Sequence, residues 1–310
     1  MNKFISIVAP MFNEQGNISE FYNRITEVMS ALPYSYELIF IDDGSKDRTA
    51  LLLNELVQKD SRVQAYLFSR NFGHQIALTC GLDHAKGDAV ITMDGDLQHP
   101  PEIIPKLLQL WEEGYQIVQT VRESTADASL FKNFTSAVYY KIINTVSEVH
   151  ITPGGSDFRL MDKSAVQAFC LYRERARFLR GMINNLGFKY TVVEFVAPPR
   201  FAGTSKYNFR KMLHFALDGI TAFSNVPLRW ALYAGFFLGF GSLLLLLHVA
   251  YVKYVAQDAI PGWSTLAVSV LFLGGIQLVG IGIVGEYVGR VFEEVKQRPL
   301  YIVSEHLVKK

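Results

Sequence analysis

The chain has few cysteines, no excess of charge of one sign and no glycine-rich phosphate loop. Only Cys80 and Cys170 occur among its 310 residues, far apart and without motif spacing, so we expect free thiols in a reducing compartment. The net charge of +1 argues against a nucleic-acid-binding surface. Neither the dinucleotide fingerprint nor the P-loop pattern follows any apolar run, so the phosphates of a bound nucleotide would need a metal ion to neutralise them.

Charged residues are also missing from two apolar runs near the C-terminus. Ala231–Val252 and Ser264–Val284 contain no Asp, Glu, Lys or Arg. Each run is long enough to cross a hydrocarbon core of about 30 Å as a helix. A buried helical hairpin in a soluble protein is the alternative, and two such runs in succession make it the less favoured one. The sequence therefore predicts two transmembrane helices.

Basic residues flank these runs unequally. The connecting loop offers only Lys253 against Asp258. Those that precede the first run or follow the second are Arg210, Lys211, Arg229, Arg290, Lys296 and Arg298. The positive-inside rule then puts both chain ends in the cytoplasm and the loop outside. Because Met1–Pro10 is too short and too strand-like for a secretory signal, we expect a two-span protein of the inner (cytoplasmic) membrane with a cytoplasmic N-terminal part.

The N-terminal part alternates between short apolar runs and helix-like stretches. The predicted strands are Phe4–Ala9, Tyr36–Ile41, Val63–Phe68, Ala89–Met93, Tyr115–Val121, Phe158–Met161 and Lys189–Val196. The predicted helices are Asn17–Leu32, Arg48–Lys59, Gln75–Ala85, Pro101–Glu113 and Leu130–Val146. Strands that alternate with helices predict an α/β fold with a mostly parallel sheet and right-handed crossovers.

Each of the first four predicted strands is followed by polar residues. These endings are Asn13-Glu14, Asp42-Asp43-Gly44-Ser45, Arg70-Asn71-Phe72-Gly73-His74 and Asp94-Gly95-Asp96-Leu97-Gln98. Carboxyl ends of parallel strands meet at one edge of a sheet, where open α/β folds bind their ligands. We therefore expect one site that is built from all four endings.

Asp94 and Asp96 are the candidate metal ligands. Two carboxylates one residue apart at a strand end are hard donors that suit Mg²⁺ or Mn²⁺ bound together with substrate phosphates, and Gln98 adds a neutral oxygen. Taken alone, such a pair is equally consistent with a surface turn that caps the next helix. The convergence of four polar endings favours the metal site.

Three later segments have two interpretations each. Asp157 follows a glycine-rich turn and is either a functional carboxylate or the ion-pair partner of Arg159. The segment Gly203–Tyr207 is either a basic loop over a phosphate or a plain linker. Tyr207–Asn225 places apolar residues at helical spacing, and it is either a helix in the lipid interface or an amphipathic helix packed on the N-terminal domain.

In this order the motifs resemble those of the family 2 glycosyltransferases, which have the GT-A fold. With two C-terminal spans the chain is similar to polyprenyl-phosphate glycosyltransferases such as dolichyl-phosphate mannose synthases and bacterial undecaprenyl-phosphate glucosyltransferases. The resemblance covers nearly the whole chain, and it departs at Thr204, where an acidic residue is frequent. The matching pieces are Pro10 to Glu14, Asp42 to Ser45, Arg70 to Gly73, Asp94 to Gln98, Asp157 to Arg159, Gly203 to Tyr207 and Glu286 to Pro299.

The resemblance implies roles for individual residues. Those implied to bind the nucleotide are Pro10, Asn13, Glu14, Asp42, Asp43, Arg70 and Asp94. Those implied to hold the Mg²⁺ or Mn²⁺ cofactor with the diphosphate are Asp94, Asp96 and Gln98, and those implied to lie near an acceptor phosphate are Arg122, Lys132, Arg200, Ser205 and Lys206. Asp96 and Asp157 are implied to be catalytic, Asp157 either as a base or as a positioning group.

The reaction implied by the resemblance is an inverting displacement from a nucleoside-diphosphate sugar to a polyprenyl phosphate. UDP-glucose and undecaprenyl phosphate are the first choices, with GDP-mannose, UDP-GlcNAc and other UDP-sugars left open. A polysaccharide synthase would have more spans and a Gln-x-x-Arg-Trp motif, which this chain lacks. A non-catalytic sugar-nucleotide-binding membrane protein would lack the paired aspartates or Asp157, which this chain has.

The sequence divides into four parts under this interpretation. We expect a Rossmann-like GT-A catalytic domain over 1–205, an amphipathic interfacial region over 206–227, a transmembrane hairpin over 228–290 and a cytoplasmic tail over 291–310. Membrane lipids are then partners, and glycine-rich spans permit the close helix packing of a homo-oligomer.

Overall fold

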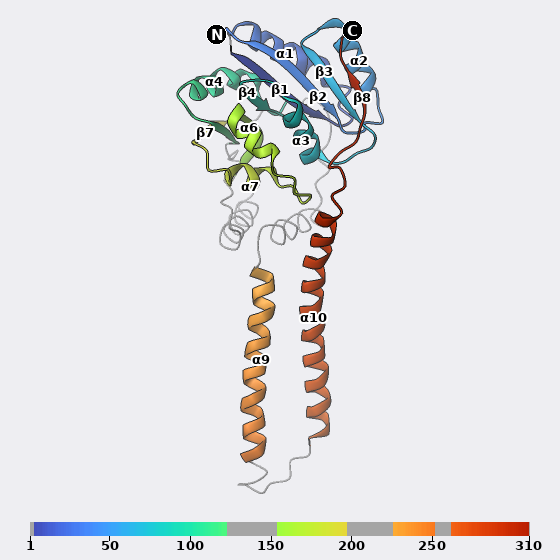
Figure 1. Cartoon of the computed structure of the whole chain (residues 1–310), viewed down its shortest axis with the longest axis vertical. Helices are drawn as coiled ribbons and strands as arrows, with labels where there is room; N and C mark the ends of the chain where they lie inside the picture. Colours follow the sequence, from blue (N-terminus) through green and yellow to red (C-terminus); the bar gives the residue numbers. More distant parts are fainter. Residues whose placement is uncertain (1–2, 123–153, 197–225, 252–261, 310) are drawn as a thin grey trace. The chain divides into compact units, whose positions relative to one another are not determined.

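The computed structural model describes residues 3–122, 154–196, 226–251 and 262–309 (Figure 1). The chain forms two compact units. The first comprises Met1–Thr145, Val149–Met212 and Arg298–Lys310, and the second comprises Val146–Glu148 and Leu213–Gln297. The C-terminal residues therefore belong to the same unit as the N-terminus, although a helical unit separates them in sequence.

The first unit is built on an eight-stranded sheet with the order β7-β5-β6-β4-β1-β2-β3-β8. Its strands are β1 (Phe4–Met11), β2 (Ser35–Asp42), β3 (Val63–Phe68), β4 (Ala89–Thr92), β5 (Ile117–Arg122), β6 (Gly155–Asp162), β7 (Tyr190–Phe195) and β8 (Val303–Leu307). The pairs β4–β1, β1–β2, β2–β3 and β5–β7 are parallel. Strand β6 pairs antiparallel with both β4 and β5, and β8 pairs antiparallel with β3. The predicted α/β fold is confirmed, and the sheet is mixed, with four parallel and three antiparallel strand pairs among the described residues.

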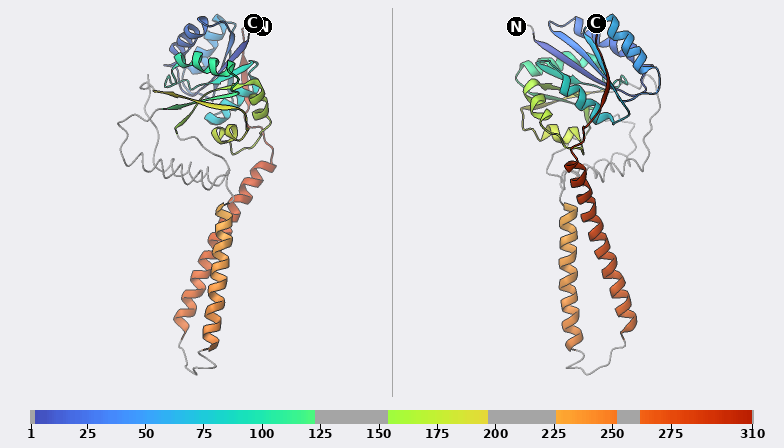
Figure 2. Two further views of the ribbon diagram at one scale, coloured as in Figure 1. Left: turned by 90° about the vertical axis from the view of Figure 1, so that its left-hand side faces the viewer. Right: turned by 45° about the vertical axis from the view of Figure 1, so that its right-hand side comes forward.

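Helices cover both faces of this sheet (Figure 2). On one face α1 (Ile18–Ser30), α2 (Thr49–Lys59), the short η1 (Pro101–Ile103) and α4 (Ile104–Glu112) surround the main core. Helices α3 (His74–His84) and α6 (Lys163–Cys170) pack on the opposite face, and α7 (Leu179–Asn184) follows α6. The apolar positions of α1 recur every three or four residues and are buried, which is the spacing that gives a helix one core-facing side.

The strand register brings the polar endings together. Strands β1 and β2 pair from Phe4↔Ser35 to Met11↔Asp42, and β4 joins β1 at Val8↔Thr92. Because these strands run in one direction, the residues that follow each of them start from the same edge of the sheet. The fold therefore brings these polar endings to one edge of the sheet.

The sequence pattern does not predict α6, α7 or β8. Strand β6 begins at Gly155, three residues before the predicted strand, so Asp157 lies within the strand and not in a loop before it. The predicted helix Leu130–Val146 and the amphipathic segment Tyr207–Asn225 lie outside the described residues.

The described part of the second unit consists of α9 (Val226–Tyr251) and α10 (Trp263–Val295), which contact each other. Both expose large apolar side chains, among them Phe236 and Phe237 at 80% each and Leu278 at 71%. Within the described residues one segment, Phe272–Val295, is long and apolar enough to cross a membrane, and Leu228–Leu244 is apolar but shorter. One candidate membrane helix is thus found, and a second span stays a proposal.

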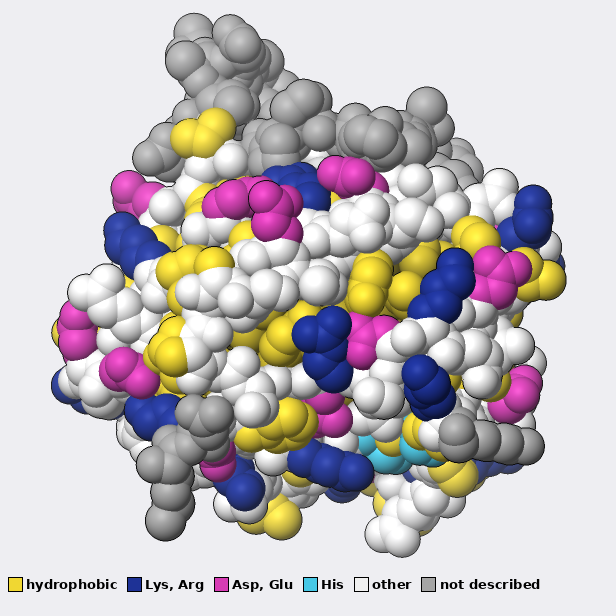
Figure 3. Space-filling view, turned by 90° about the horizontal axis from the view of Figure 1, so that it is seen from above, with side chains coloured by type: hydrophobic (Ala, Val, Ile, Leu, Met, Phe, Trp, Pro, Cys, Tyr) yellow, Lys and Arg dark blue, Asp and Glu magenta, His cyan; other side chains and the backbone are white. Residues whose placement is uncertain are grey.

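The surface of the first unit carries both signs of charge. Seen from above, cationic and anionic side chains are interspersed among small groups of hydrophobic ones (Figure 3). This mixture on the visible face agrees with the near-zero net charge of the sequence.

Candidate active site

The end of β2 is tied to the loop that follows β3. Asp43, which is 3% exposed, accepts hydrogen bonds from the backbone N–H groups of Phe72 (2.6 Å) and Gly73 (2.9 Å). Asn71 donates from its side chain to the backbone oxygen of Asp43 (3.2 Å). Burial raises the pKa of Asp43, and the two N–H groups oppose that rise by stabilising the carboxylate.

The loop after β1 is joined to the turn after β2. Asn13 has a φ of +56°, a left-handed conformation that Asn tolerates. Its N–H donates to Ser45 Oγ (2.9 Å), and Lys46 N–H donates to its side-chain oxygen (2.9 Å). Ser45 Oγ in turn donates to Asp42, a buried carboxyl whose pKa burial raises. The structure therefore brings to one edge the nucleotide candidates Pro10, Asn13, Glu14, Asp42, Asp43 and Arg70.

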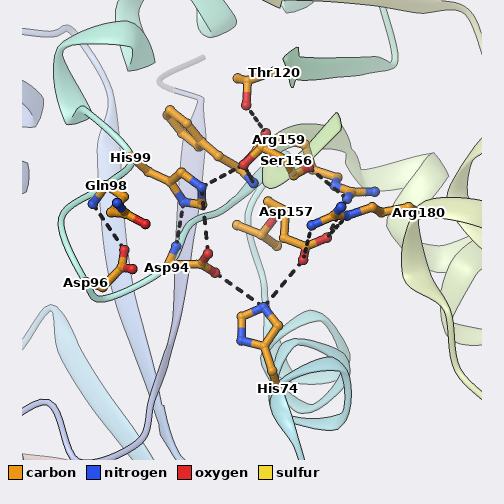
Figure 4. A network of polar contacts seen from close by, with 12 residues as sticks. His74, Asp94, Asp96, Gln98, His99, Thr120, Ser156, Asp157, Arg159 and Arg180 are labelled. Carbon is orange, nitrogen blue, oxygen red and sulfur yellow. Dashed lines mark hydrogen bonds and ion pairs between the residues drawn. The ribbon is translucent and has the colours of Figure 1, made fainter. Parts of the chain in front are cut away.

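The turn after β4 holds the paired aspartates (Figure 4). Asp96 Oδ1 accepts from the N–H of Gln98 (3.1 Å), and Leu97 between them has a φ of +61°. Gly95 leaves room for the side chain of Met11, since a Cβ at this position would lie 2.3 Å from the Met11 sulfur and would displace it. The chain thus reverses directly after the strand and keeps both carboxylates at the edge.

The residues of this turn fit a divalent metal ion. Asp94 Oδ1 is buried and makes no hydrogen bond within the described structure, and the cationic group that faces it there is the His74 ring, with Nε2 3.3 Å away. The described residues contain no group of three or more His, Cys, Asp or Glu placed to hold a metal. Two carboxylates and an amide oxygen suit an ion such as Mg²⁺, which keeps waters and takes substrate phosphates as its remaining ligands.

His99 holds the backbone of Asp94, although no local sequence pattern points to this role. The N–H of Asp94 donates to His99 Nδ1 (2.9 Å), and His99 Nε2 lies 2.6 Å from Ser156 Oγ. The ring stacks on Phe158 with centroids 5.3 Å apart and is 6% exposed. His99 therefore connects the turn that holds Asp94 and Asp96, here named the metal turn, to β6.

Asp157 lies on β6 among three cationic side chains (Figure 4). Arg159 Nη2 donates to Asp157 Oδ1 (2.9 Å), and Arg180 of α7 donates to both carboxylate oxygens (3.1 Å each). His74 Nε2 is 3.6 Å from Asp157 and 3.3 Å from Asp94, so it bridges the two carboxylates. The Arg159 ion pair, one of the two interpretations of Asp157, is present, and so is proximity to the metal turn.

These partners set the charges of the site. Burial alone would raise the pKa of Asp157, but the hydrogen bond from His74 and the charges of Arg180 and Arg159 hold it well below its usual range. Burial lowers the pKa of His74, but the charges of Asp94 and Asp157 outweigh it and raise this pKa to about 9. Asp157 is therefore a carboxylate at neutral pH, and its positive neighbours make it a weak proton acceptor.

Only weak local signals point to these partners of Asp157. His74 follows the Arg70–Gly73 motif directly, and Arg180 ends a basic run that starts at Arg173. Neither position reveals that both side chains reach Asp157.

The acceptor candidates are mostly not described. Arg122 ends β5, is exposed, and donates its backbone N–H to the oxygen of Gly154 (3.1 Å). Those outside the described residues are Lys132, Arg200, Ser205 and Lys206.

The fold is α/β, and the candidate residues, Asp94 and Asp96 among them, lie at the carboxyl ends of parallel strands, where open α/β folds bind their ligands. The chain belongs to glycosyl transferase family 2, whose family model matches residues 6–169. The predicted family and the predicted enzyme class, a glycosyltransferase, are confirmed.

Relatives match almost the full length of the chain. An uncharacterized glycosyltransferase of Synechocystis sp. is 44% identical, covering 97% of this chain and 95% of that protein. A bactoprenol glucosyl transferase of Shigella phage SfII is 42% identical, covering 97% of each. A prophage bactoprenol glucosyl transferase homolog of Escherichia coli K12 is 40% identical, covering 97% of this chain and 98% of that one.

A solved structure supports the fold. The mannosyl-3-phosphoglycerate synthase from Rubrobacter xylanophilus superposes with a TM-score of 0.51 at 15% identity, covering 71% of this chain and 72% of that one. At this identity the likeness shows the shared fold alone.

Proposed function

We propose that the protein transfers glucose from UDP-glucose to a polyprenyl phosphate, undecaprenyl phosphate being the first choice, at the cytoplasmic face of a membrane. The observation that carries this proposal is the full-length similarity to bactoprenol glucosyl transferases of phage and bacterial origin. The position of Asp43, Asp94 and Asp157 near one sheet edge supports the proposal.

The donor would lie across the ends of β1, β2 and β4. Asn13, Asp42 and Asp43, with Pro10, Glu14 and Arg70 around them, would hold the base and ribose. Asp94, Asp96 and Gln98 would hold Mg²⁺ or Mn²⁺ together with the diphosphate. The ion supplies electrostatic stabilisation of the charge that develops on the leaving diphosphate.

The acceptor needs little activation. A phosphate monoester has a second pKa near ~6, so at neutral pH it is mostly a dianion. One of its oxygens forms the new bond to the anomeric carbon while the bond from that carbon to the diphosphate breaks, which inverts the configuration. No proton has to be removed from a dianion, so Asp157 would serve chiefly to hold Arg180 and His74 in place, with uptake of a residual proton as its second role.

The remaining parts of the proposal concern the membrane. Arg122, Lys132, Arg200, Ser205 and Lys206 would surround the acceptor phosphate. The hairpin over 228–290 would cross the membrane twice, with the domain over 1–205, the interfacial region over 206–227 and the tail over 291–310 on the cytoplasmic side. The apolar exposure of α9 and α10 supports contact with lipid tails.

The test is a donor panel. Purified protein is incubated with undecaprenyl phosphate, Mg²⁺ or Mn²⁺ and single sugar nucleotides, and the lipid is analysed by mass spectrometry. We expect a hexosyl phosphate lipid with UDP-glucose, and none with Asp96→Asn or with excess chelator. A product formed only from another sugar nucleotide would show that UDP-glucose is not the donor. Full activity in excess chelator would show that the reaction needs no metal ion.

A further inference from the structure

The C-terminal segment, defined as Arg298–Leu307, returns to the first unit after α10. Its strand β8 pairs antiparallel with β3, from Ala65↔Leu307 to Phe68↔Val303 (Figure 1). Residues that follow the predicted spans therefore complete an edge of the catalytic sheet. The proposed function assigns this segment no role.

The segment is fastened to the backbone that enters the donor loop, defined as Arg70–Gly73. The N–H of Ser69 donates to the oxygen of Ile302 (3.0 Å), and Ser304 Oγ donates to the oxygen of Leu67 (2.9 Å). These hydrogen bonds continue the pairing of β8 with β3 up to the residue before Arg70.

A column of aromatic rings connects the segment to the donor loop. Tyr301 stacks on Phe68 with centroids 5.4 Å apart and an interplanar angle of 13°. Phe68 meets Phe72 edge to face at 5.6 Å and 84°. Phe72 donates its backbone N–H to Asp43. A chain of contacts thus runs from Tyr301 through the rings of Phe68 and Phe72 to Asp43, a carboxylate of the proposed nucleotide site.

Tyr301 also binds the C-terminal end of α3. Its hydroxyl donates to Asp83 Oδ2 (2.8 Å), which Arg173 also contacts (2.9 Å). Helix α3 begins at His74, the residue that bridges Asp94 and Asp157. The ring of Tyr301 therefore holds the start of the stretch from Phe68 to Asp83, and its hydroxyl holds the end.

We propose that Tyr301 is a positioning residue of the donor site and that the C-terminal segment keeps the donor loop in its binding conformation. A four-residue loop loses conformational freedom when a nucleotide binds, and contacts that order it beforehand reduce that cost. Donor binding then depends on residues that lie beyond the second predicted span. This inference rests on the proposed function, because it takes the Asp43 region to be where the nucleotide binds.

The test compares Tyr301→Ala and Tyr301→Phe with a control, Ile302→Ser, in the full-length protein. Ile302 is 53% exposed and its hydrogen bond to Ser69 uses the backbone, so its side chain is dispensable for the column. Amide hydrogen exchange of residues 69–74 is measured without ligand, UDP affinity is measured by calorimetry with Mn²⁺, and KM is measured for donor and acceptor. Should Tyr301→Ala fail to fold, Tyr301→Leu takes its place.

We expect Tyr301→Ala to speed exchange at Phe72 and Gly73, and to weaken UDP binding and raise the donor KM by about tenfold, with kcat and the acceptor KM unchanged. Tyr301→Phe keeps the stacked ring, so it should restore UDP affinity while losing the hydrogen bond to Asp83. Ile302→Ser should match the wild type.

Lower thermal stability in Tyr301→Ala with unchanged exchange and unchanged UDP affinity would overturn the proposal, because the segment would then stabilise the fold only. A wild type that binds no UDP would contradict the proposed uridine donor, and the exchange measurement would still decide the role of Tyr301.

Discussion

Asp157 is at the same time a buried ion-pair partner and a member of the candidate site. It neutralises Arg159, which is 1% exposed. Removing one partner of a buried pair leaves an uncompensated charge, which costs about 3–5 kcal/mol of stability. We therefore expect Asp157→Asn to lose both turnover and thermal stability, measured by lipid product formation and by thermal unfolding.

A second variant separates these two effects. In Asp157→Asn combined with Arg159→Met, both buried charges are gone, so stability should return towards that of the wild type. Turnover should stay about 100-fold or more below the wild type if the carboxylate acts in the reaction or holds Arg180 there. Recovery of turnover together with stability would reduce Asp157 to a structural residue.

Asp60 should make the free energy of unfolding depend on pH in a direction that its pKa determines. Hydrogen bonds from Arg62, together with one from Tyr22, outweigh burial and lower the pKa of Asp60 to about 2. Because its folded pKa is below its unfolded value, its stabilisation is complete above pH ~4 and is lost as the pH falls towards 2. At pH 7, Asp60→Asn should lower the free energy of unfolding by at most about 2 kcal/mol.

The measurement is urea unfolding of both proteins at pH 7, 5 and 3. The difference should be equal at the two higher pH values and smaller at pH 3. Glu55→Gln, which removes an exposed carboxyl on α2, is the control and should change little. A difference that grows on acidification would contradict the assignment.

At the scale of elements, the parts that the sequence predicted are those with local signals. Strands β1 to β4 are apolar runs with polar endings, and both features are visible within a few residues. Strand β8 has the sequence VSEHL, in which only Leu307 is buried, and its partner β3 is more than 230 residues away. Its pairing is a non-local contact that no short pattern encodes.

The candidate site shows the same division. Asp94 and Asp96 were predicted because their spacing and strand-end position are local features. His99 and Arg180 were not, because their roles depend on Ser156 and Asp157 in another element. The Asp157–Arg159 ion pair is one of two interpretations of the sequence, whereas the burial of both charges becomes visible only in the folded sheet.

The turn after β2 supplies a prediction at this scale. Gly44 has a φ of +69°, and a Cβ there would lie 2.5 Å from the carbonyl carbon of Arg70 and 2.7 Å from the nitrogen of Asn71. Backbone atoms cannot move aside as a side chain would, so Gly44→Ala should displace the donor loop. We expect lower thermal stability and weaker UDP binding.

Gly187→Ala is the matched control. Gly187 has a φ of +73° but nothing within 4 Å of the added Cβ. This variant should therefore lose only the stability that a left-handed backbone costs a residue with a side chain, about 1–2 kcal/mol. Equal losses of stability in the two variants, with UDP binding intact in both, would show that the contact with the donor loop is unimportant.

At the scale of the whole molecule, the chain leaves the catalytic unit for two apolar helices and then returns to it. Exposed side chains such as Phe236, Phe237 and Leu278 require an apolar environment outside the chain. We propose that a lipid bilayer provides that environment, since Phe272–Val295 is long and apolar enough to cross one. If both helices cross it, the two ends of the chain lie on one side, as a sheet built from both of them requires.

The last prediction is therefore topological. A cysteine at Gln257, in the loop between the two apolar runs, should react with a membrane-impermeant thiol reagent in intact cells. The basic residues before the first run and after the second favour the cytoplasm for both chain ends, which places this loop outside. Native Cys80 is buried and cannot report on the cytoplasmic side, so Glu55→Cys on the exposed surface of α2 serves there, in a chain that carries Cys170→Ser. The α2 cysteine should react only after the cells are opened. Reaction at Glu55→Cys but not at Gln257→Cys in intact cells would reverse the orientation, and with it the supply of sugar nucleotide from the cytoplasm.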